Sequence, residues 1–312
     1  IKMKKIVLLA ILTTICSCKS NHTDYETIEK NNEFRENVLK KNTGKYAVLA
    51  DGYTYFEQAN QHSLSGTIIL VHGWSVPSYI WKLTFESLKE KGYHVVMLDL
   101  YGRGNSDNPN LPQTDALRAK QVVQLANTLK ISKAIFVGLS NGGRIISKIA
   151  DLAPEKVQGL CYVGSSSFQE HATPTNTKVS AQEIKDFIAG YPSRSAGQLE
   201  DFYRPENFPD WPQKYEPLLQ HKGFAKALLS TDKNLVSMDA IHQKIHQSGI
   251  PVYTFWGAHD NVVVYADFKQ KLNALLPNRT EYFIPNAGHL PHLENQKVFE
   301  GYFLNALATI LN

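Results

Sequence analysis

The feature that most constrains the fold of this chain is a serine flanked by glycines, the G-x-S-x-G sequence of residues 138–142. An apolar run, residues 133–137, precedes it, and an amphipathic run, residues 144–150, follows it. This order predicts a strand, a tight turn and a helix. Such a turn strains the backbone of its central residue and brings chain segments so close together that side chains at Gly138 and Gly142 would clash.

The predicted turn places the Ser140 hydroxyl at the carboxyl end of a strand and the amino end of a helix. The first N–H groups of a helix lack partners and carry partial positive charge. A serine held there can attack a carbonyl group while backbone N–H groups receive the negative charge. A plain glycine-serine turn is the alternative interpretation. The strand before the motif and the helix after it are the context that a nucleophilic serine requires, and they favour a nucleophile.

Length and composition indicate one large domain. The chain has 312 residues, of which 43% are hydrophobic and 20% charged, as is typical of a soluble globular protein. This length suffices for one α/β domain with an insertion. No linker rich in glycine, serine or proline divides the sequence, and no internal repeat is present.

The amino-terminal residues are typical of an export signal. Lys2, Lys4 and Lys5 precede an apolar stretch, residues 6–15, which is too short to span a bilayer. The segment resembles a bacterial lipoprotein signal, with residues 1–17 as signal peptide and Cys18 as the lipidated residue. An ordinary secretory signal is the alternative. We expect an exported protein, lipid-anchored to a bacterial membrane on its periplasmic or surface face, with residues 18–45 as a polar tether or a peripheral helix.

Charge and cysteine content narrow the possible partners. Removal of residues 1–17 takes away three lysines and no acidic residue, so the formal net charge falls from +4 to +1. No electrostatic argument for nucleic-acid binding remains.

Once Cys16 is removed and Cys18 is lipidated, only Cys161 is left, within an apolar strand. A disulfide framework is therefore not expected, and Cys161 is interpreted as a small buried apolar residue.

Strand and helix patterns alternate along most of the chain. A hairpin is predicted for residues 46–57, and a helix capped by Ser78 follows the first buried strand. The alternation predicts an α/β fold with a mostly parallel, doubly wound, eight-stranded sheet. The strands are expected at residues 46–50, 53–57, 67–71, 93–98, 133–137, 157–163, 252–256 and 281–284. Later helices are expected at residues 114–129, 264–276 and 294–311.

Residues 165–247 interrupt the alternation. They contain no convincing buried strand and many aromatic rings among polar residues and prolines. We expect short helices that form a cap over the site, inserted between core segments 46–164 and 248–312. An ordinary helical insertion whose aromatic rings form their own small core is the alternative, and both can hold together.

Three chemically suited residues follow predicted strands at the carboxyl edge of the sheet, where α/β proteins collect their chemistry. Ser140 is a nucleophile that needs a base, His289 has a pKa suited to neutral pH, and Asp260 can orient the imidazole. Their chain order is the one found in α/β-hydrolases. Asp232, Asp239 and Asp267 are rivals of Asp260, and His292 is a rival of His289, whereas His259 is interpreted as structural.

Five segments together resemble the α/β-hydrolase superfamily, serine esterases and lipases with a helical cap. They are His72-Gly73-Trp74 and residues 99–106, 138–143, 256–260 and 287–289. The resemblance, which runs from about Tyr46 to the end, implies a Ser140–Asp260–His289 triad, an oxyanion hole made by the backbone N–H groups of Trp74 and Asn141, and elbow glycines at Gly138 and Gly142. It also implies structural roles for His72 and for the turn of residues 99–107. The indole of Trp74 is a candidate wall of the acyl pocket.

The site predicts hydrolysis of a carboxylic ester through an acyl-enzyme, as in carboxylesterases and acylglycerol lipases, with a small-molecule acyl substrate. No cofactor or metal is required, since neither an H-E-x-x-H motif nor a Cys/His cluster is present. A serine at the elbow argues against the aspartate-dependent dehalogenases and epoxide hydrolases. Amidases, proline-type aminopeptidases, thioesterases, C–C bond hydrolases and haloperoxidases remain alternatives. A lipid-anchored binding or sensing protein with a slow hydrolase site is another, and the oligomeric state stays open.

Overall fold

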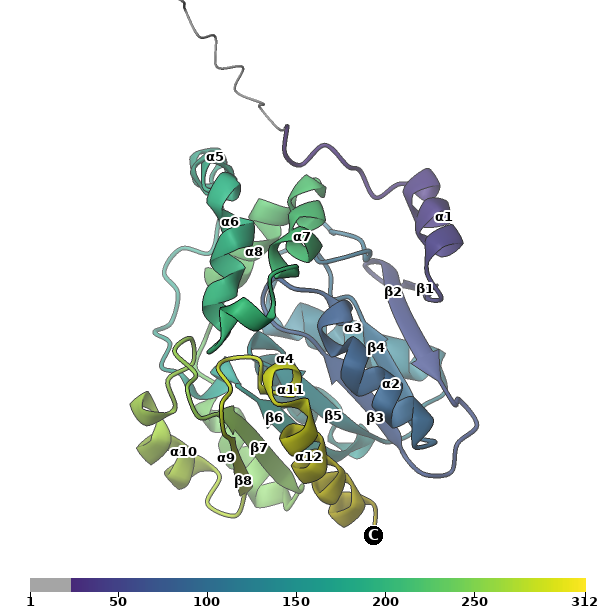
Figure 1. Ribbon diagram of the computed structural model, residues 1–312, viewed down its shortest axis with the longest axis vertical. Helices are drawn as coiled ribbons and strands as arrows, with labels where there is room; N and C mark the ends of the chain where they lie inside the picture. The colour runs from purple at the N-terminus through teal and green to yellow at the C-terminus, as the bar shows by residue number, and fades with distance from the viewer. Residues whose placement is uncertain (1–23) are drawn as a thin grey trace, which may run out of the picture.

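Eight strands form one sheet with the order β1-β2-β4-β3-β5-β6-β7-β8 in a computed structural model that describes residues 24–312 (Figure 1). β2 is antiparallel to both of its neighbours, and every other pair is parallel. The expected mostly parallel, eight-stranded sheet is confirmed. The strands are β1 (Lys45–Leu49), β2 (Gly52–Ala59), β3 (Thr67–Val71), β4 (His94–Leu98), β5 (Ala134–Leu139), β6 (Val157–Val163), β7 (Val252–Gly257) and β8 (Thr280–Ile284).

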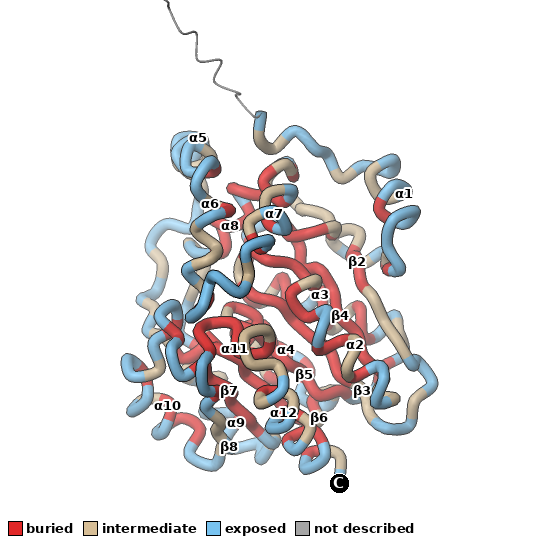
Figure 2. The backbone as a smooth tube through the Cα atoms, viewed as in Figure 1, coloured by how far each residue is buried: buried red, intermediate tan, exposed pale blue. Residues whose placement is uncertain are grey.

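Helices cover both faces of the sheet. Along β3, Ile68 and Leu70 point into one apolar cluster and Ile69 and Val71 into the other, because successive side chains in a strand point to opposite faces. The first cluster includes α2 (Lys82–Glu90) and α12 (Gln296–Leu311). The second includes α3 (Asp115–Thr128), α4 (Asn141–Leu152), α9 (Asp239–Ser248) and α10 (Lys269–Leu275). Figure 2 shows the resulting buried band of strands at the centre of the molecule.

Two predicted helices differ in detail from the structure. Ser78 caps no helix, because its N–H and its hydroxyl both donate to the buried Asp99 carboxylate, at 2.8 and 2.6 Å. The helix expected at residues 264–276 is divided at Phe268 into a short 3₁₀ turn and α10. The closing helix expected from about residue 294 is confirmed as α12, and a one-turn helix, α11 (Pro291–Glu294), precedes it. Thr114 does cap α3, through a 3.0 Å hydrogen bond from Leu117 N–H.

The insertion after β6 forms a layer of short helices above the carboxyl edge of the sheet (Figure 1). Its α-helices are α5 (Ala181–Ala189), α6 (Tyr191–Gly197), α7 (Trp211–Tyr215) and α8 (Phe224–Asp232). Their buried aromatic rings join the apolar cluster of α2 and α12 and do not form a separate core. The insertion also ends earlier than expected. α9 falls within residues 165–247, but Ile245 and His242 pack it against the α4 face of the sheet.

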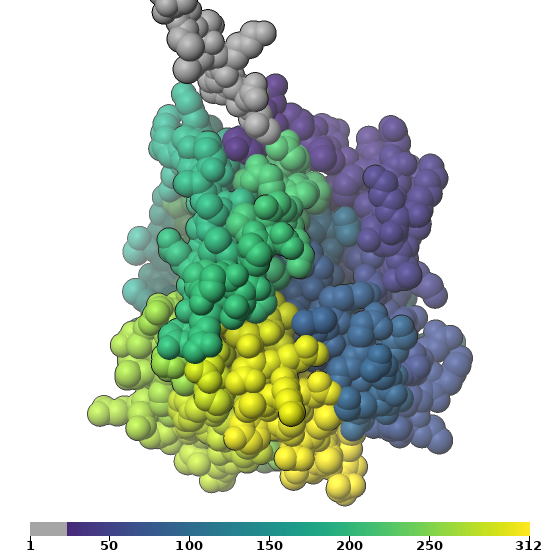
Figure 3. Space-filling model, viewed as in Figure 1, coloured from purple at the N-terminus to yellow at the C-terminus, as the bar shows by residue number. Residues whose placement is uncertain are grey.

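The amino-terminal part of the described chain lies against the cap and the core. Residues 18–45 were expected to form either a polar tether or a peripheral helix. The described part of this segment contains one helix, α1 (Asn32–Lys41). Before it, Ile28 pairs with His221 of the cap in an isolated parallel bridge. Figure 3 shows these purple residues alongside the green cap. The predicted signal peptide and Cys18 lie outside the described residues. Among residues 24–312, no helix has the length and apolar character needed to cross a membrane.

Candidate active site

The turn between β5 and α4 has the strained geometry that the sequence predicts. Ser140 lies between the last strand residue and the first helix residue, with φ 52° and ψ −118°. A Cβ atom at Gly142 would lie 2.5 Å from the carbonyl oxygens of Val71 and His72. A Cβ atom at Gly138 would lie 2.5 Å from the Gly142 carbonyl oxygen. The two glycines therefore let the turn approach β3 closely enough to project one hydroxyl from the sheet edge.

His289 and Asp260 come together after the last two strands. Asp260 Oδ2 accepts a hydrogen bond from His289 Nδ1 at 2.9 Å, and both residues are buried. The second carboxylate oxygen of Asp260 accepts the N–H groups of Val262 and Val263 at 2.9 and 2.8 Å. These contacts fix the carboxylate, which in turn fixes the tautomer and orientation of the imidazole.

The electrostatic surroundings make the His289 ring more basic than a free imidazole. Burial by itself lowers the pKa of His289, but the carboxylates of Asp260, Asp201 and Glu294 outweigh burial and raise it above its ordinary value of 6.5. A protonated ring at this position is stabilised by the negative charge around it. The site therefore favours a histidine that accepts a proton.

Ser140 and His289 line the same cavity, of about 240 Å³. Within the described chain, no hydrogen bond joins the Ser140 hydroxyl to the His289 ring, a contact that often tightens only when substrate is bound. Ser75, Gln198 and Asp201 contribute polar atoms to the wall. The apolar part of the wall comes from Trp74, Val76, Ile80, Leu139, Val262 and Leu290. Trp74 also meets Phe187 of α5 edge to face, so the cap closes this side.

Two backbone N–H groups lie beside Ser140 without a partner among residues 24–312. They belong to Trp74 and Asn141, and neither donates a hydrogen bond to another described residue. Gly73 holds the Trp74 loop against the elbow, since a Cβ atom there would lie 3.3 Å from Ser140 Cβ. Arg103 fixes the same loop through a 2.7 Å hydrogen bond from its Nε to the Trp74 carbonyl oxygen. The arrangement provides two free donors where a negatively charged oxygen can be received.

Known proteins share the fold of this chain. The pattern of the family described as alpha/beta hydrolase fold matches residues 66–296. The chain belongs to the α/β-hydrolase fold family. It is a hydrolase of this type, with esterases among its relatives.

Two curated α/β-hydrolase relatives cover most of the chain. A pimeloyl-(acyl-carrier protein) methyl ester esterase of Shewanella woodyi is 27% identical over 248 residues, which make up 74% of this chain and 90% of that protein. Lipase 3 of a Moraxella species is 24% identical over 266 residues, 81% of each chain. Among solved structures, an esterase from Exiguobacterium antarcticum superimposes with a TM-score of 0.71 at 18% identity, covering 85% of this chain and 100% of that one. The structural likeness concerns the fold alone.

Three other histidines of this α/β-hydrolase have structural contacts. His72 Nε2 accepts the Leu100 N–H at 2.9 Å, and its Nδ1 donates to the Gly73 carbonyl oxygen at 3.0 Å, so it braces the loop that carries Trp74. His259 is exposed and stacks on Tyr203. His292 is buried against Trp81, and burial lowers its pKa to about 3.

No hydrogen bond within residues 24–312 joins a rival aspartate to His289. Asp239 pairs with Lys271 at 2.8 Å, and Asp267 is exposed. Asp232 lies near Arg103 and Trp74, and partial burial raises its pKa to about 6. Cys161 is a fully buried thiol within β6, as expected. Among residues 24–312, no group of three or more His, Cys, Asp or Glu side chains is placed to hold a metal ion.

Asp201 and Gln198 are cavity residues that sequence reasoning missed. They belong to a one-turn 3₁₀ helix, Gln198–Asp201, within the cap. The backbone carbonyl of Asp201 accepts the His289 N–H at 2.8 Å, which brings the cap onto the last βα loop. No local pattern in the sequence marks this contact, because it joins segments that are far apart along the chain.

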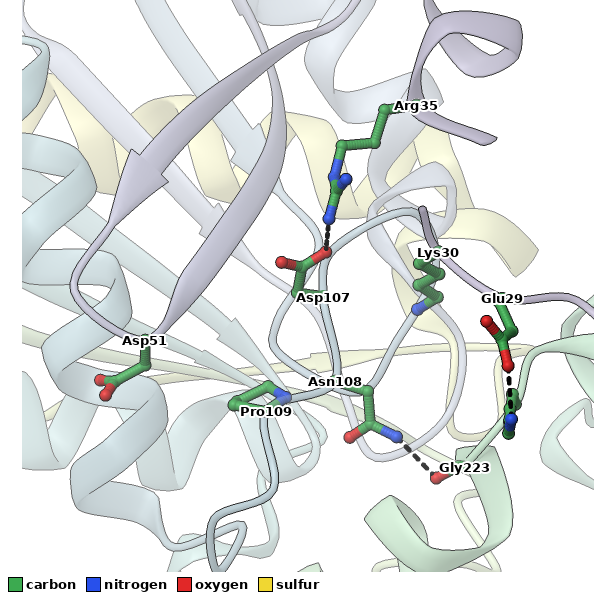
Figure 4. Close-up of a pocket in the computed structure, with 9 residues that line it drawn as sticks. Glu29, Lys30, Arg35, Asp51, Asp107, Asn108, Pro109 and Gly223 are labelled. Atoms are coloured by element: carbon green, nitrogen blue, oxygen red, sulfur yellow. Dashed lines mark hydrogen bonds and ion pairs between the residues drawn. The ribbon is translucent and has the colours of Figure 1, made fainter. Parts of the chain in front are cut away.

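A second cavity, of about 380 Å³, lies where the amino-terminal segment meets the cap and the turn after β4 (Figure 4). Arg35 pairs with Asp107 at 2.8 Å, and Glu29 pairs with Lys222 of the cap. Lys30 donates to the Ser106 carbonyl oxygen at 2.6 Å, and burial lowers its pKa to about 7. These contacts hold three segments together, and no nucleophile or base lines the cavity in the manner of Ser140 and His289.

Proposed function

We propose that this α/β-hydrolase cleaves carboxylic esters through an acyl-enzyme formed on Ser140. The proposal rests on the positions of three side chains. The buried His289 ring is oriented by a 2.9 Å hydrogen bond to Asp260, and it lines the same cavity as Ser140, whose backbone has a φ of 52°. The curated relatives named as an esterase and a lipase support an ester as the substrate.

The proposed mechanism follows from the hydrogen bonds of His289. Because Nδ1 donates to Asp260, the lone pair of Nε2 is left to take the Ser140 proton. Ser140 Oγ then bonds to the carbonyl carbon, and the free N–H groups of Trp74 and Asn141 receive the charge on its oxygen. The imidazolium gives its proton to the departing alcohol. Water attacks the acyl-enzyme by the same route and releases the acid.

A labelling experiment and a substitution test this proposal together. A serine-directed phosphonate should attach to Ser140, located by mass spectrometry of the modified peptide. Ser140→Ala should lower kcat/KM for p-nitrophenyl esters by about 10⁴-fold or more. Ser193→Ala removes an exposed cap hydroxyl that bonds only to the Gly190 carbonyl oxygen, and it serves as the matched control. Equal activity of wild type and Ser140→Ala, with no label on Ser140, would overturn the ester mechanism.

A second experiment distinguishes an ester substrate from an amide substrate. Wild-type kcat/KM is measured for an ester and for the amide with the same acyl group. We expect the ester to be the better substrate by more than its greater intrinsic reactivity. If the amide, corrected for that reactivity, is turned over faster, the amidase alternative replaces the esterase.

We extend the proposal to the location of the protein. Residues 1–17 would direct export, and Cys18 would carry the lipid that anchors the hydrolase to a bacterial membrane. The support is the order of basic, apolar and small residues before Cys18. Metabolic labelling with palmitate should mark the wild-type chain and fail to mark Cys18→Ser. Incorporation that persists in Cys18→Ser would show that this residue is not the anchor.

A further inference from the structure

The residues that line the Ser140 cavity include one acidic residue, Asp201. The side chains that line the cavity include no lysine and no arginine, so His289 is the only residue there that can carry positive charge. Much of the remaining wall, including Val76, Ile80 and Leu290, is apolar and offers no compensating charge. Asp201 is therefore an acidic residue of the lining that no lining lysine or arginine can neutralise.

The position of Asp201 is fixed by its backbone and not by its carboxylate. Its carbonyl oxygen accepts the His289 N–H at 2.8 Å, whereas no described residue donates a hydrogen bond to its side chain. Burial raises the pKa of Asp201, His289 lowers it, and Asp260 and Glu200 raise it further. The side chain is only partly buried and faces a cavity, so a charged group of a bound molecule can pair with it. A cavity that receives substrate provides the place for such a partner.

The side of the ester that Asp201 faces follows from the proposed mechanism. His289 delivers its proton to the departing oxygen, so the alcohol part of the ester lies beside the imidazole. The oxyanion donors Trp74 and Asn141 lie beside the elbow. Asp201 lines the same cavity as His289, and its carboxylate acts on the charge of the imidazole, so it lies on the alcohol side.

Resting on the proposed esterase function, we propose that Asp201 determines specificity for the alcohol part of the substrate. It favours esters of cationic alcohols, such as amino alcohols, and rejects esters of alcohols that carry a carboxylate. A positive charge in the cavity would supply the missing partner of the carboxylate, and a negative charge would meet like charge in a poorly solvated site.

The test uses butyrate esters of three alcohols, namely choline, its uncharged carbon isostere neohexanol, and γ-hydroxybutyrate. The kcat/KM values are measured on the alkaline plateau of the His289 titration, with the neohexyl ester as internal reference. Wild type should prefer the choline ester to the anionic ester by about tenfold or more after correction for intrinsic reactivity. In Asp201→Asn this ratio should collapse toward one. Because a change in His289 basicity scales all three rates alike, the ratios isolate the effect of Asp201 on the alcohol.

Glu200→Gln is the matched control. It removes the same charge one residue away, from an exposed side chain that does not line the cavity, and should preserve the wild-type ratios. An unselective wild type, or an Asp201→Asn enzyme that keeps the preference, would overturn the proposal while leaving the esterase function intact. The wild-type ratio decides this even if Asp201→Asn folds poorly.

Calorimetric binding separates failure of specificity from failure of the esterase function. The three esters are titrated into Ser140→Ala and into Ser140→Ala/Asp201→Asn, where no turnover is needed. Tighter binding of the choline ester than of the anionic ester, lost in the double variant, supports the role of Asp201 even if wild type cleaves no ester. Equal binding of both esters by Ser140→Ala contradicts it.

Discussion

The sheet edge and the cap meet across one cavity, but they hold their residues there by different means. At the sheet edge, local backbone geometry positions the side chains. Ser140 has a strained φ, and the N–H groups of Val262 and Val263 donate hydrogen bonds to the Asp260 carboxylate. In the cap, contacts between distant segments hold Asp201 against His289 and Thr231 against Arg103. The proposed reaction therefore depends on local backbone geometry, and the proposed substrate preference depends on contacts between distant segments.

The comparison predicts that single atoms at the sheet edge control the rate. Asp260→Asn keeps the size of the side chain but no longer fixes the His289 tautomer, so we expect kcat for esters to fall by about 10⁴-fold. Asp267→Asn makes the same change at an exposed position nearby and should have no measurable effect. Steady-state kinetics of the two purified variants provide the measurement. A loss below about tenfold in Asp260→Asn would remove Asp260 from the proposed mechanism.

Glycines of the two regions should respond in opposite directions to the same substitution. Gly142→Ala forces a Cβ atom to within 2.5 Å of two carbonyl oxygens, so we expect a loss of about 3 kcal/mol in the free energy of unfolding. Gly197→Ala, at the end of α6, meets nothing within 4 Å at a φ of −60° and should gain about 0.5 kcal/mol. Urea unfolding of both variants measures the difference. Equal stability of the two would contradict the view that close backbone approach is specific to the elbow.

The same contrast explains which parts could be predicted from the sequence. Gly138, Ser140 and Gly142 are close neighbours along the chain, and Asp260 and His289 each follow a recognisable strand, so pattern and spacing located them. Position relative to the strands also separated His289 from its rivals. The proposed catalytic residues of the sheet edge were therefore accessible to local reasoning.

The cap residues were not accessible in this way. Asp201 lies in a short 3₁₀ turn among irregular segments, and only a long-range hydrogen bond to His289 reveals its place. The polar composition of residues 18–45 favoured a tether as much as a helix, because the docking partners of Glu26 and Lys30 lie far along the chain. Ser78 was misassigned for a related reason: a buried carboxylate after β4 competes for its donors.

A third prediction concerns how the amino-terminal segment holds the cap. The Glu26 carboxylate accepts the N–H groups of Gly223 and Ala225 at the start of α8, at 2.7 and 2.6 Å, and the Tyr191 hydroxyl at 2.8 Å. Negative charge at a helix amino terminus is stabilising, so Glu26→Gln should cost about 1–2 kcal/mol. Hydrogen exchange of the α8 amides should accelerate, while exchange in β5 stays unchanged.

Glu29→Gln is the control for this prediction, since it alters a carboxylate in the same segment that pairs only with exposed Lys222. It should leave exchange in α8 as in wild type. If Glu26→Gln behaves like Glu29→Gln, the segment does not brace the cap, and the cap is held by its buried aromatic rings alone.

The smallest expected effect is a pH shift that couples the two regions. His289 must be neutral to act as a base, so ester kcat/KM should fall as the pH drops through its pKa, which lies above 6.5. Because the cap carboxylate of Asp201 helps to raise that pKa, Asp201→Asn should move the acid limb of the profile to lower pH. Glu200→Gln, which changes an exposed carboxylate outside the cavity, should leave the limb in place. An Asp201→Asn profile that coincides with that of wild type would show that the cap sets the substrate without tuning the base, and the two regions would then be electrostatically independent.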